Sequence, residues 1–307
     1  MNPIYYIDRQ SGQIKQEKVY REKALELVYG QGLMNRFLKL TFLPLITRFP
    51  LFSKFYGFLQ KLPRSVKKIE PFIKAYEINT LEFAEPVSHF RSFNDFFIRH
   101  LKPEARPIDS TSNSAVIPAD GRYYFFENIN HCDGFLVKGK KFHLKELLGS
   151  VELAKEYEGG SMVMARLCPS DYHRFHFPID SIPSETSLIN GYLYSVNPMA
   201  VKHNIHIFSQ NKRTLSCLKS SLFDDVLYME IGATCVGSIQ QTYEPNQKQQ
   251  KGQEKGYFEF GGSSLIILFK PNRIRFNQDL LDATHKGMEI LCLMGQQMGA
   301  AINSINA

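Results

Sequence analysis

The chain has 307 residues, of which 43% are hydrophobic and 22% are charged, and its formal net charge is +7. These proportions are ordinary for a folded globular protein and exclude a disordered chain. Five widely spaced cysteines without a Cys-x-x-Cys pair argue against a disulfide framework or a zinc site, and favour a reducing compartment. The chain opens without an apolar segment and contains no run of about 18 apolar residues, so we expect neither a signal peptide nor a membrane span.

Residues 22 to 85 show a helical periodicity that prolines interrupt. Breaks at Pro44, Pro50 and Pro63 predict two or three short helices instead of one long helix. Their apolar faces are rich in Phe and Leu, and between residues 36 and 75 nine basic residues accompany a single acid, Glu70 (Arg36, Lys39, Arg48, Lys54, Lys61, Arg64, Lys67, Lys68 and Lys74). Two interpretations remain open. Either the apolar face enters the surface of an anionic membrane, or it packs on the body of the protein while the charges stay solvated.

From Ala115 onward, short β-prone runs alternate with turns. We expect strands at Val116–Ile117, Tyr123–Phe126, Phe135–Val137, Ser161–Leu167, Leu188–Tyr194, Leu215–Leu218, Val226–Ile231, Cys235–Ile239 and Ser264–Phe269. Helices are expected at Leu144–Leu148 and after Met199, and the Gln- and Lys-rich stretch Thr242–Lys255 predicts an exposed, mobile loop. The fold class is therefore α+β: N-terminal amphipathic helices over residues 1–90, followed by a β-rich, barrel- or sandwich-like catalytic body over residues 91–307.

A Gly-Gly-Ser-Ser turn, Gly261 to Ser264, lies between two apolar runs late in the chain. Glycine permits strained backbone angles and leaves the Gly262 carbonyl accessible from both sides. The hydroxyl of Ser263 follows that carbonyl directly and could attack it. Taken alone, the turn also fits a kinked hairpin with two solvated serines, so the interpretation depends on the rest of the chain.

A serine hydroxyl needs a neighbouring base, and the base works best when a carboxylate orients it. The chain offers His173 and His176 as bases and Asp120, in a Pro-Ala-Asp-Gly turn, as the acid. Plainer interpretations exist: Asp120 in such a turn commonly bonds to its own backbone, and the histidines could be structural. Their spacing of three would suit a metal pair on a helix, but Pro169 and Pro178 bracket the segment and no third ligand stands nearby, so no metal is predicted.

Three motifs occur in order along the chain: Ile117-Pro-Ala-Asp-Gly-Arg122, Leu167-Cys-Pro-Ser-Asp-Tyr-His-Arg-Phe-His-Phe-Pro178 and the Gly-Gly-Ser-Ser turn. With the segment Phe93 to Pro107, the run Val137-Lys-Gly-Lys-Lys-Phe and the run Tyr194-Ser-Val-Asn-Pro198, they resemble the phosphatidylserine decarboxylase family, a group of self-processing, pyruvoyl-dependent membrane enzymes. The resemblance covers about residues 25 to 300. One such motif would be a weak signal, whereas several in order are a strong one.

The resemblance implies a self-cleavage reaction. Ser263 Oγ would attack the Gly262 carbonyl in an N-to-O acyl shift, with His176 matching the base and Asp120 its orienting acid. Elimination would release the upstream chain, and hydrolysis would leave a pyruvoyl group in place of Ser263. The products would be a large (β) chain of residues 1–262 and a small (α) chain of residues 263–307. The family commonly has Thr where this chain has Ser264. The hydroxyl is kept, so Ser264 could support cleavage by polarising the Gly262 carbonyl, but it could also compete as the nucleophile. Gly261, the other supporting residue, fits a Gly-Gly-Ser form of the motif.

The resemblance also implies the substrate, partners and location. The pyruvoyl group would serve as electron sink while phosphatidylserine loses CO2 to give phosphatidylethanolamine, and His173 is the candidate that supplies the proton. We expect a peripheral protein on the cytoplasmic side of the cell membrane, bound to an anionic membrane surface, forming a homodimer and binding no nucleic acid.

Two other function classes are weighed against this one. A Ser-His-Asp hydrolase could use Ser263 on external esters, but the chain lacks a Gly-x-Ser-x-Gly elbow at that position. A non-catalytic basic module could bind an anionic membrane or a nucleic acid through residues 36–75. The Phe residues there follow a helical face, unlike the stacking platforms of nucleic-acid binders.

Overall fold

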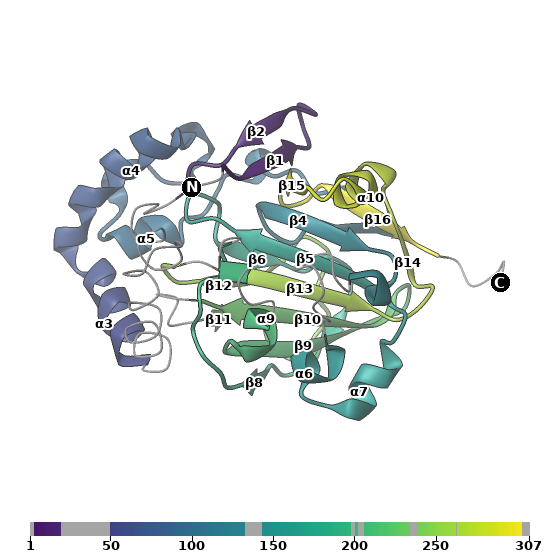
Figure 1. Ribbon diagram of the computed structural model, residues 1–307. Coiled ribbons are helices and arrows are strands. Elements are labelled where there is room, and N and C mark those ends of the chain that lie inside the picture. Colours follow the sequence, from purple (N-terminus) through teal and green to yellow (C-terminus); the bar gives the residue numbers. More distant parts are fainter. Residues whose placement is uncertain are drawn as a thin grey trace.

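The structure is a computed structural model that describes residues 3–19, 50–132, 143–197, 200–201, 206–233, 239–261 and 263–302. The N-terminal helices gather at one end of a β-rich body, beyond the ends of its central strands (Figure 1). In these ranges, no helix combines the length and the apolar character needed to cross a bilayer.

The N-terminal part consists of a β-hairpin and a group of helices. The hairpin comprises β1 (Tyr5–Asp8) and β2 (Ile14–Gln16). The helices are α3 (Pro50–Lys61), a 3-10 helix (Pro63–Lys68), α4 (Ile69–Tyr76) and α5 (Phe93–Phe97), with 3-10 turns at Thr80–Glu82, Val87–His89 and Pro103–Ala105. Pro63 opens a helical segment, as predicted, because the fixed φ of proline suits the first turn of a helix, and Pro50 is the first described residue of α3.

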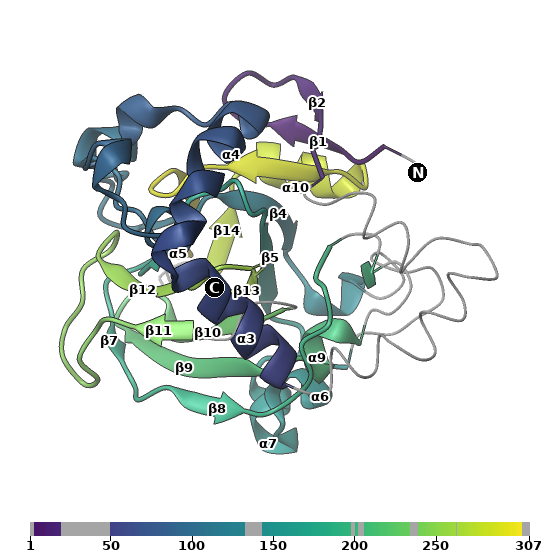
Figure 2. The same ribbon diagram turned by 90° about the vertical axis from the view of Figure 1, so that its left-hand side faces the viewer.

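An aromatic cluster joins these helices to the β-rich body. Its buried members are Ile69, Phe72, Phe83, Phe90, Phe93, Phe96, Phe97 and Phe260. Phe260 lies three residues before Ser263, so the helical part packs directly on the segment that carries the predicted cleavage site. Figure 2 shows α3 and α5 in front of the ends of the central strands. Phe55 and Phe58 of α3 remain 61% and 57% exposed, so the Phe-rich stripe is divided between packing and solvent.

A ten-stranded sheet forms the centre of the body, in the order β2-β1-β15-β4-β5-β13-β10-β9-β7, with β8 also paired to β9. Its further strands are β4 (Gly121–Phe126), β5 (Ser161–Leu167), β7 (Ile182–Pro183), β8 (Ser187–Ile189), β9 (Arg213–Ser220), β10 (Asp224–Gly232), β13 (Ser263–Phe269) and β15 (Glu289–Cys292). Strands β1 and β15 are parallel, and the other pairs in this sheet are antiparallel. Strand β13 lies between β5 and β10 and is buried along its whole length.

Each face of the central sheet is covered. One face packs against α10 (Gln278–His285) and two three-stranded sheets. The first small sheet has the order β11 (Ile239–Gln241), β12 (Glu254–Phe258), β6 (Arg174–His176). The second has the order β14 (Ile274–Phe276), β16 (Gln297–Ala301), β3 (Ser114–Val116). The other face packs against α6 (Leu144–Leu148) and α9 (Ile207–Gln210), with α7 (Val151–Glu156) and a 3-10 turn (Ile129–Cys132) nearby. Side chains of β13 alternate between the two cores, which explains its uninterrupted apolar sequence.

The predicted α+β class, with helices ahead of a β-rich body, is confirmed. The expected strand Ser161–Leu167 and helix Leu144–Leu148 match β5 and α6, whereas the strand expected at Leu188–Tyr194 is confined to β8. The exposed loop predicted over Thr242–Lys255 is wrong at Gln249 and Lys255, which are buried, because Lys255 belongs to β12 and bonds to a buried acid. Several expectations fall on residues that lie outside the described ranges: the strand at Phe135–Val137, most of the strand at Cys235–Ile239, the break at Pro44, the run Val137–Phe142 and Pro198. The division at residue 90 stays a prediction.

Candidate active site

Ser263 is the first residue of β13 and is fully buried. It lies opposite Leu167 of β5 and Gly232 of β10, so both neighbouring strands fix its backbone. Within the described part of the chain its hydroxyl has no hydrogen-bond partner, and the same holds for Ser264. Because side chains alternate along a strand, the two hydroxyls point to opposite faces of the sheet. The serine that could compete with Ser263 is therefore in a different environment.

The segment before Ser263 is held by the helical part and by the motif that contains the histidines. The Phe258 backbone N–H donates to the His173 carbonyl at 2.9 Å, and the Phe260 N–H donates to Asn94 Oδ1 at 2.9 Å. Gly261 has a φ of +150°, a conformation that residues with a side chain rarely adopt. Gly262 itself lies outside the described residues, so its carbonyl is not placed.

His173 lies beside this segment and is fully buried. Its Nδ1 contacts the Asp171 carbonyl at 3.0 Å, and because a carbonyl only accepts, Nδ1 carries the proton and Nε2 keeps its lone pair. Burial lowers the pKa of His173 to about 3, although the backbones of Asp171 and Gly261 favour the protonated ring. Nε2 has no hydrogen-bond partner of ordinary geometry in the described ranges. His173 is therefore neutral at physiological pH and has to gain a proton before it can donate one.

His176 lies at the end of β6, with both ring nitrogens occupied. Nδ1 contacts the Gly252 carbonyl at 2.9 Å and Nε2 lies 3.3 Å from the Tyr172 hydroxyl, so this ring is also held in one tautomer. Burial lowers the pKa of His176, while the carboxylates of Glu254 and Asp120 act to raise it. His176 is thus a neutral, oriented imidazole whose lone pair, on Nε2, faces the Tyr172 hydroxyl, and among the described residues no hydrogen bond joins it to Ser263.

Asp120 follows the Pro-Ala pair ahead of β4, and its carboxylate is held by Arg106. Arg106 Nε donates to both carboxylate oxygens at 2.9 and 3.0 Å, Nη2 donates at 2.6 Å, and the Met294 backbone N–H donates at 2.8 Å. Asp120 affects the pKa of His176 through its charge, but no hydrogen bond joins these two described residues. The structure therefore brings Asp120 near His176 without the direct contact of a hydrolase triad.

Comparison with known proteins identifies the group to which the chain belongs. The family model for phosphatidylserine decarboxylase matches residues 93–300. The phosphatidylserine decarboxylase proenzyme of Chlamydia pneumoniae is 48% identical over 97% of this chain and 98% of its own length. A protein of the same name from Fusobacterium nucleatum is 45% identical over 96% of this chain and 97% of its own length. The chain belongs to the phosphatidylserine decarboxylase family.

Membership of the phosphatidylserine decarboxylase family favours the self-processing interpretation over a hydrolase and over a non-catalytic basic module. The relatives are named as proenzymes, which implies that their chains are processed. The structure leaves the roles of Asp120, His173, His176 and Ser263 as predictions, but it brings Ser263 and the segment that carries both histidines to one end of the sheet.

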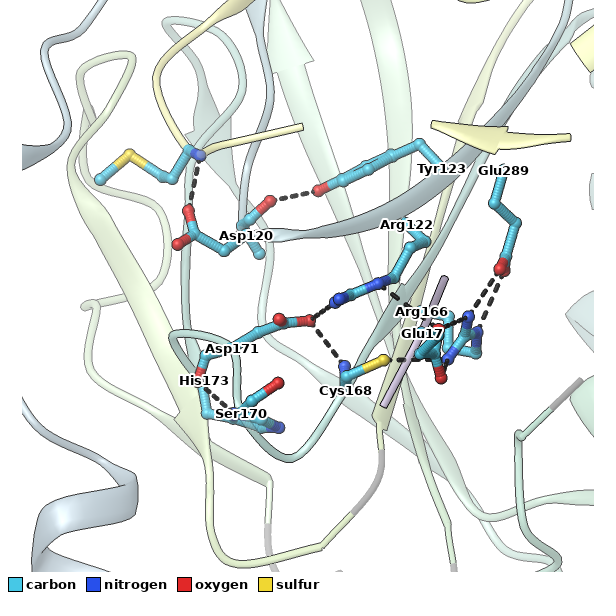
Figure 3. A network of polar contacts seen from close by, with 12 residues as sticks. Glu17, Asp120, Arg122, Tyr123, Arg166, Cys168, Ser170, Asp171, His173 and Glu289 are labelled. Carbon is cyan, nitrogen blue, oxygen red and sulfur yellow. Dashed lines mark hydrogen bonds and ion pairs between the residues drawn. The ribbon is translucent and has the colours of Figure 1, made fainter. Parts of the chain in front are cut away.

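Sequence reasoning on this decarboxylase-family chain missed a buried polar network beside the histidine motif (Figure 3). Arg122 donates to the Asp171 carboxylate, and Arg166 binds Glu289 through Nε at 3.0 Å and also contacts Glu17. The only signal in the sequence was that Arg122 and Asp171 both stand inside the matched motifs. Glu17 is 149 residues from its partner Arg166, and no local pattern could have connected them.

The residues of this family member form no metal site where the structure describes them. No group of three His, Cys, Asp or Glu side chains is arranged to hold an ion there. The Nδ1 atoms of His173 and His176 instead contact two backbone carbonyls, those of Asp171 and Gly252. Each of these contacts fixes the orientation of its imidazole ring.

Proposed function

We propose that this chain is a proenzyme that cleaves its own Gly262–Ser263 bond, and whose small chain then carries a pyruvoyl group derived from Ser263. Family membership carries the reaction: the decarboxylation of phosphatidylserine to phosphatidylethanolamine. The observation that supports the cleavage site best is the fully buried Ser263 hydroxyl, unpaired within the described residues and placed at the start of the central strand. A buried polar group without a partner is uncommon and points to function.

The surroundings of Ser263 suit the attack on Gly262. The pairing of β13 with both β5 and β10 fixes the serine, and the hydrogen bonds of Phe258 and Phe260 fix the chain before it. His176 is neutral and oriented, as a base must be, and the charge of Asp120 favours its protonated form after it takes a proton. We assign Ser263 as the nucleophile and His176 as the base. Asp120 is assigned as the carboxylate whose negative charge stabilises the protonated form of His176.

The residues around Ser263 fit a pyruvoyl group. The serine is fully buried and its oxygen has no competing partner in the described structure. After cleavage the group would remain at the start of β13, held by two strands. A pyruvoyl group supplies a ketone that captures the substrate amine and an electron sink for decarboxylation. His173, whose Nε2 lies beside Gly261 and has no hydrogen-bond partner of ordinary geometry among the described residues, would hold and return a proton.

We also propose that the protein binds the cytoplasmic face of the cell membrane peripherally. The exposed Phe55 and Phe58 of α3 offer apolar contact, and the exposed cations Arg64 and Lys67 follow shortly after. These helices lie at the same end of the sheet as Ser263, so contact with a bilayer would bring a lipid headgroup toward the site (Figures 1 and 2). Vesicles containing an anionic lipid should bind the protein more tightly than neutral vesicles. A homodimer is proposed on the resemblance alone, and light scattering tests it.

Turnover of the lipid tests the proposed function. Protein is incubated with mixed micelles that contain carboxyl-labelled phosphatidylserine, and released CO2 is counted beside a Ser263→Ala variant. We expect release by the unmodified protein, its loss after treatment with a hydrazine that blocks ketones, and none by the variant. Equal release by Ser263→Ala would contradict the assignment of Ser263.

A further inference from the structure

The N-terminal hairpin brings a buried carboxylate, Glu17, to the polar network beside the histidine motif. Strand β1 lies between the edge strand β2 and β15 in the central sheet, and the Glu17 backbone N–H donates to the Ile4 carbonyl at 2.9 Å. The three residues of β2 just before Glu17 are exposed, whereas Glu17 itself is 8% exposed. The hairpin therefore ends by inserting a charge into the body, well before the segment that the family model matches.

Glu17 contacts two arginines that oppose each other across neighbouring strands. Arg122 of β4 lies opposite Arg166 of β5, a like-charge pair that would be destabilising by itself. Glu17 accepts from Arg166 Nη1 at 3.1 Å and Nη2 at 2.7 Å, and lies 3.5 Å from Arg122 Nε. Glu289 contacts only Arg166 of this pair and Asp171 only Arg122. Among the described residues, Glu17 is the one carboxylate with contacts to both arginines.

The charge of Glu17 is firmly held. Burial acts to raise its pKa, but Arg166 and Arg122 outweigh burial and keep the pKa at about 2. Glu17 is therefore ionised at neutral pH. Its removal would leave two opposed, buried guanidinium groups without the carboxylate that they share, each with only one remaining carboxylate partner among the described residues.

The two arginines connect Glu17 to the candidate active site (Figure 3). Arg122 donates to the carboxylate of Asp171, and that carboxylate accepts from the Cys168 N–H at 2.7 Å. The Asp171 N–H in turn donates to the Cys168 carbonyl at 2.8 Å, which closes a tight turn. The Asp171 carbonyl accepts from His173 Nδ1 at 3.0 Å. Each link in this chain of contacts is a direct hydrogen bond or ion pair.

The second arginine leads to the cleavage strand. Arg166 lies opposite Ser264 in the pairing of β5 with β13, one residue from the predicted scissile bond. We propose that Glu17 is a positioning residue: through Arg122 it holds the turn that orients His173, and through Arg166 it fixes β5 beside the start of β13. This inference rests on the proposed function.

The test compares Glu17→Gln, which keeps the shape and removes the charge, with Lys15→Gln in the same hairpin. Lys15 pairs with Asp8 at the surface and contacts none of the network. Cleavage half-times are measured by mass after cell-free synthesis of the full chain. Amide hydrogen exchange over residues 168–173 is measured in the Ser263→Ala background, together with the melting temperature.

We expect Glu17→Gln to slow cleavage by about tenfold, equivalent to about 1.4 kcal/mol in the barrier, and to speed exchange at Cys168 and Asp171 more than in β9 or β10. Lys15→Gln should change neither.

The proposal is overturned if cleavage and local exchange are unchanged, or if the variant only melts earlier with exchange raised evenly across the sheet. If Glu17→Gln does not fold, Glu17→Asp, which keeps the charge with a shorter reach, is measured in its place against the same two outcomes. Should even the unmodified chain fail to cleave, the proposed function fails, while the exchange comparison still decides the role of Glu17.

Discussion

The imidazole ring of His173 lies against the phenyl ring of Phe97, with ring centroids 3.9 Å apart, and both side chains are fully buried. Phe97 is the last residue of α5, whose N-cap Ser92 accepts from the Asp95 N–H at 3.1 Å. The Phe97 ring also packs on Phe260, at 4.9 Å between centroids. The helical part thus shields the histidine and the segment before the predicted scissile bond with the same aromatic group.

Burial of His173 predicts a loss of stability in acid. Its pKa is lowered to about 3 in the folded protein, whereas an unfolded chain takes up the proton near pH 6.5. The contribution of the neutral His173 to the free energy of unfolding is therefore fully present above pH 6.5. It falls as the pH drops toward 3, by up to about 1.4 kcal/mol per pH unit. Urea unfolding of the Ser263→Ala precursor measures this slope.

The control for this prediction is an exposed histidine. His173→Asn should flatten the acid slope, although some remains because the pKa of His176 is lowered too, and His285→Asn should leave it unchanged. An acid slope equally steep in His173→Asn and in the precursor would contradict the buried, neutral state of His173.

The lowered pKa of His176 predicts that self-cleavage persists in mild acid. A base acts in its neutral form, and burial moves the midpoint of its titration below the ordinary value near 6.5. The cleavage rate of freshly synthesised chain should therefore stay level as the pH falls to about 6.5, and decline only below it. A midpoint above pH 7 would show that a different group is the base.

Asp120→Asn should slow self-cleavage by at least about tenfold. The change removes a charge that raises the pKa of His176, and it leaves the buried Arg106 without the carboxylate that accepts three of its hydrogen bonds. Cleavage half-times from intact mass give the measurement. Asp282→Asn, on the exposed side of α10, is the matched control. A normal half-time for Asp120→Asn would remove Asp120 from the mechanism.

Lys255 and Glu230 form a fully buried ion pair between β12 and β10. Burial lowers the pKa of Lys255, and Glu230 opposes that effect. Lys255→Met should reduce the free energy of unfolding by about 3–5 kcal/mol, because it leaves the Glu230 carboxylate buried without a cation. Urea titration of the Ser263→Ala precursor measures the change.

A double variant separates the ion pair from its packing. Lys255→Met combined with Glu230→Leu should recover most of the loss, since a buried pair replaced by apolar side chains is often neutral. The surface pair Lys61–Glu259, 2.6 Å apart, is the control, because the Lys61 side chain is 48% exposed although that of Glu259 is only 15% exposed. Lys61→Met should change stability by less than about 1 kcal/mol. Equal effects of Lys255→Met and Lys61→Met would contradict the burial of Lys255.

Elements whose apolar pattern lies within a few neighbouring residues could be predicted from the sequence. Strand β5 and helix α6 were predicted at their observed bounds, because an apolar run and a short amphipathic pattern lie within a few neighbouring residues. Lys255 was misassigned to an exposed loop, since composition alone cannot show that Glu230 and the rings of Tyr228 and Tyr243 surround its ammonium group.

The candidate site shows the same limit. Ser263, His173, His176 and Asp120 stand in motifs that can be found in the sequence, and their segments do meet at one end of the sheet. The partner of Asp120 was not predicted, because Arg106 reaches it only through the folded turn after α5. Contacts between residues distant in the chain depend on the strand order, which no motif encodes.

The central claim is that Ser263 cleaves the chain before itself, and intact mass under denaturing conditions tests it most directly. Three proteins are compared: the unmodified chain, Ser263→Ala, and Ser264→Ala as the control at the adjacent, equally buried hydroxyl. We predict that the unmodified chain and Ser264→Ala yield a fragment ending at Gly262 and a small chain with a ketone at its N-terminus, while Ser263→Ala stays whole at about 35.3 kDa. A Ser263→Ala chain that still splits at this bond, or an unmodified chain that stays whole, would contradict the account.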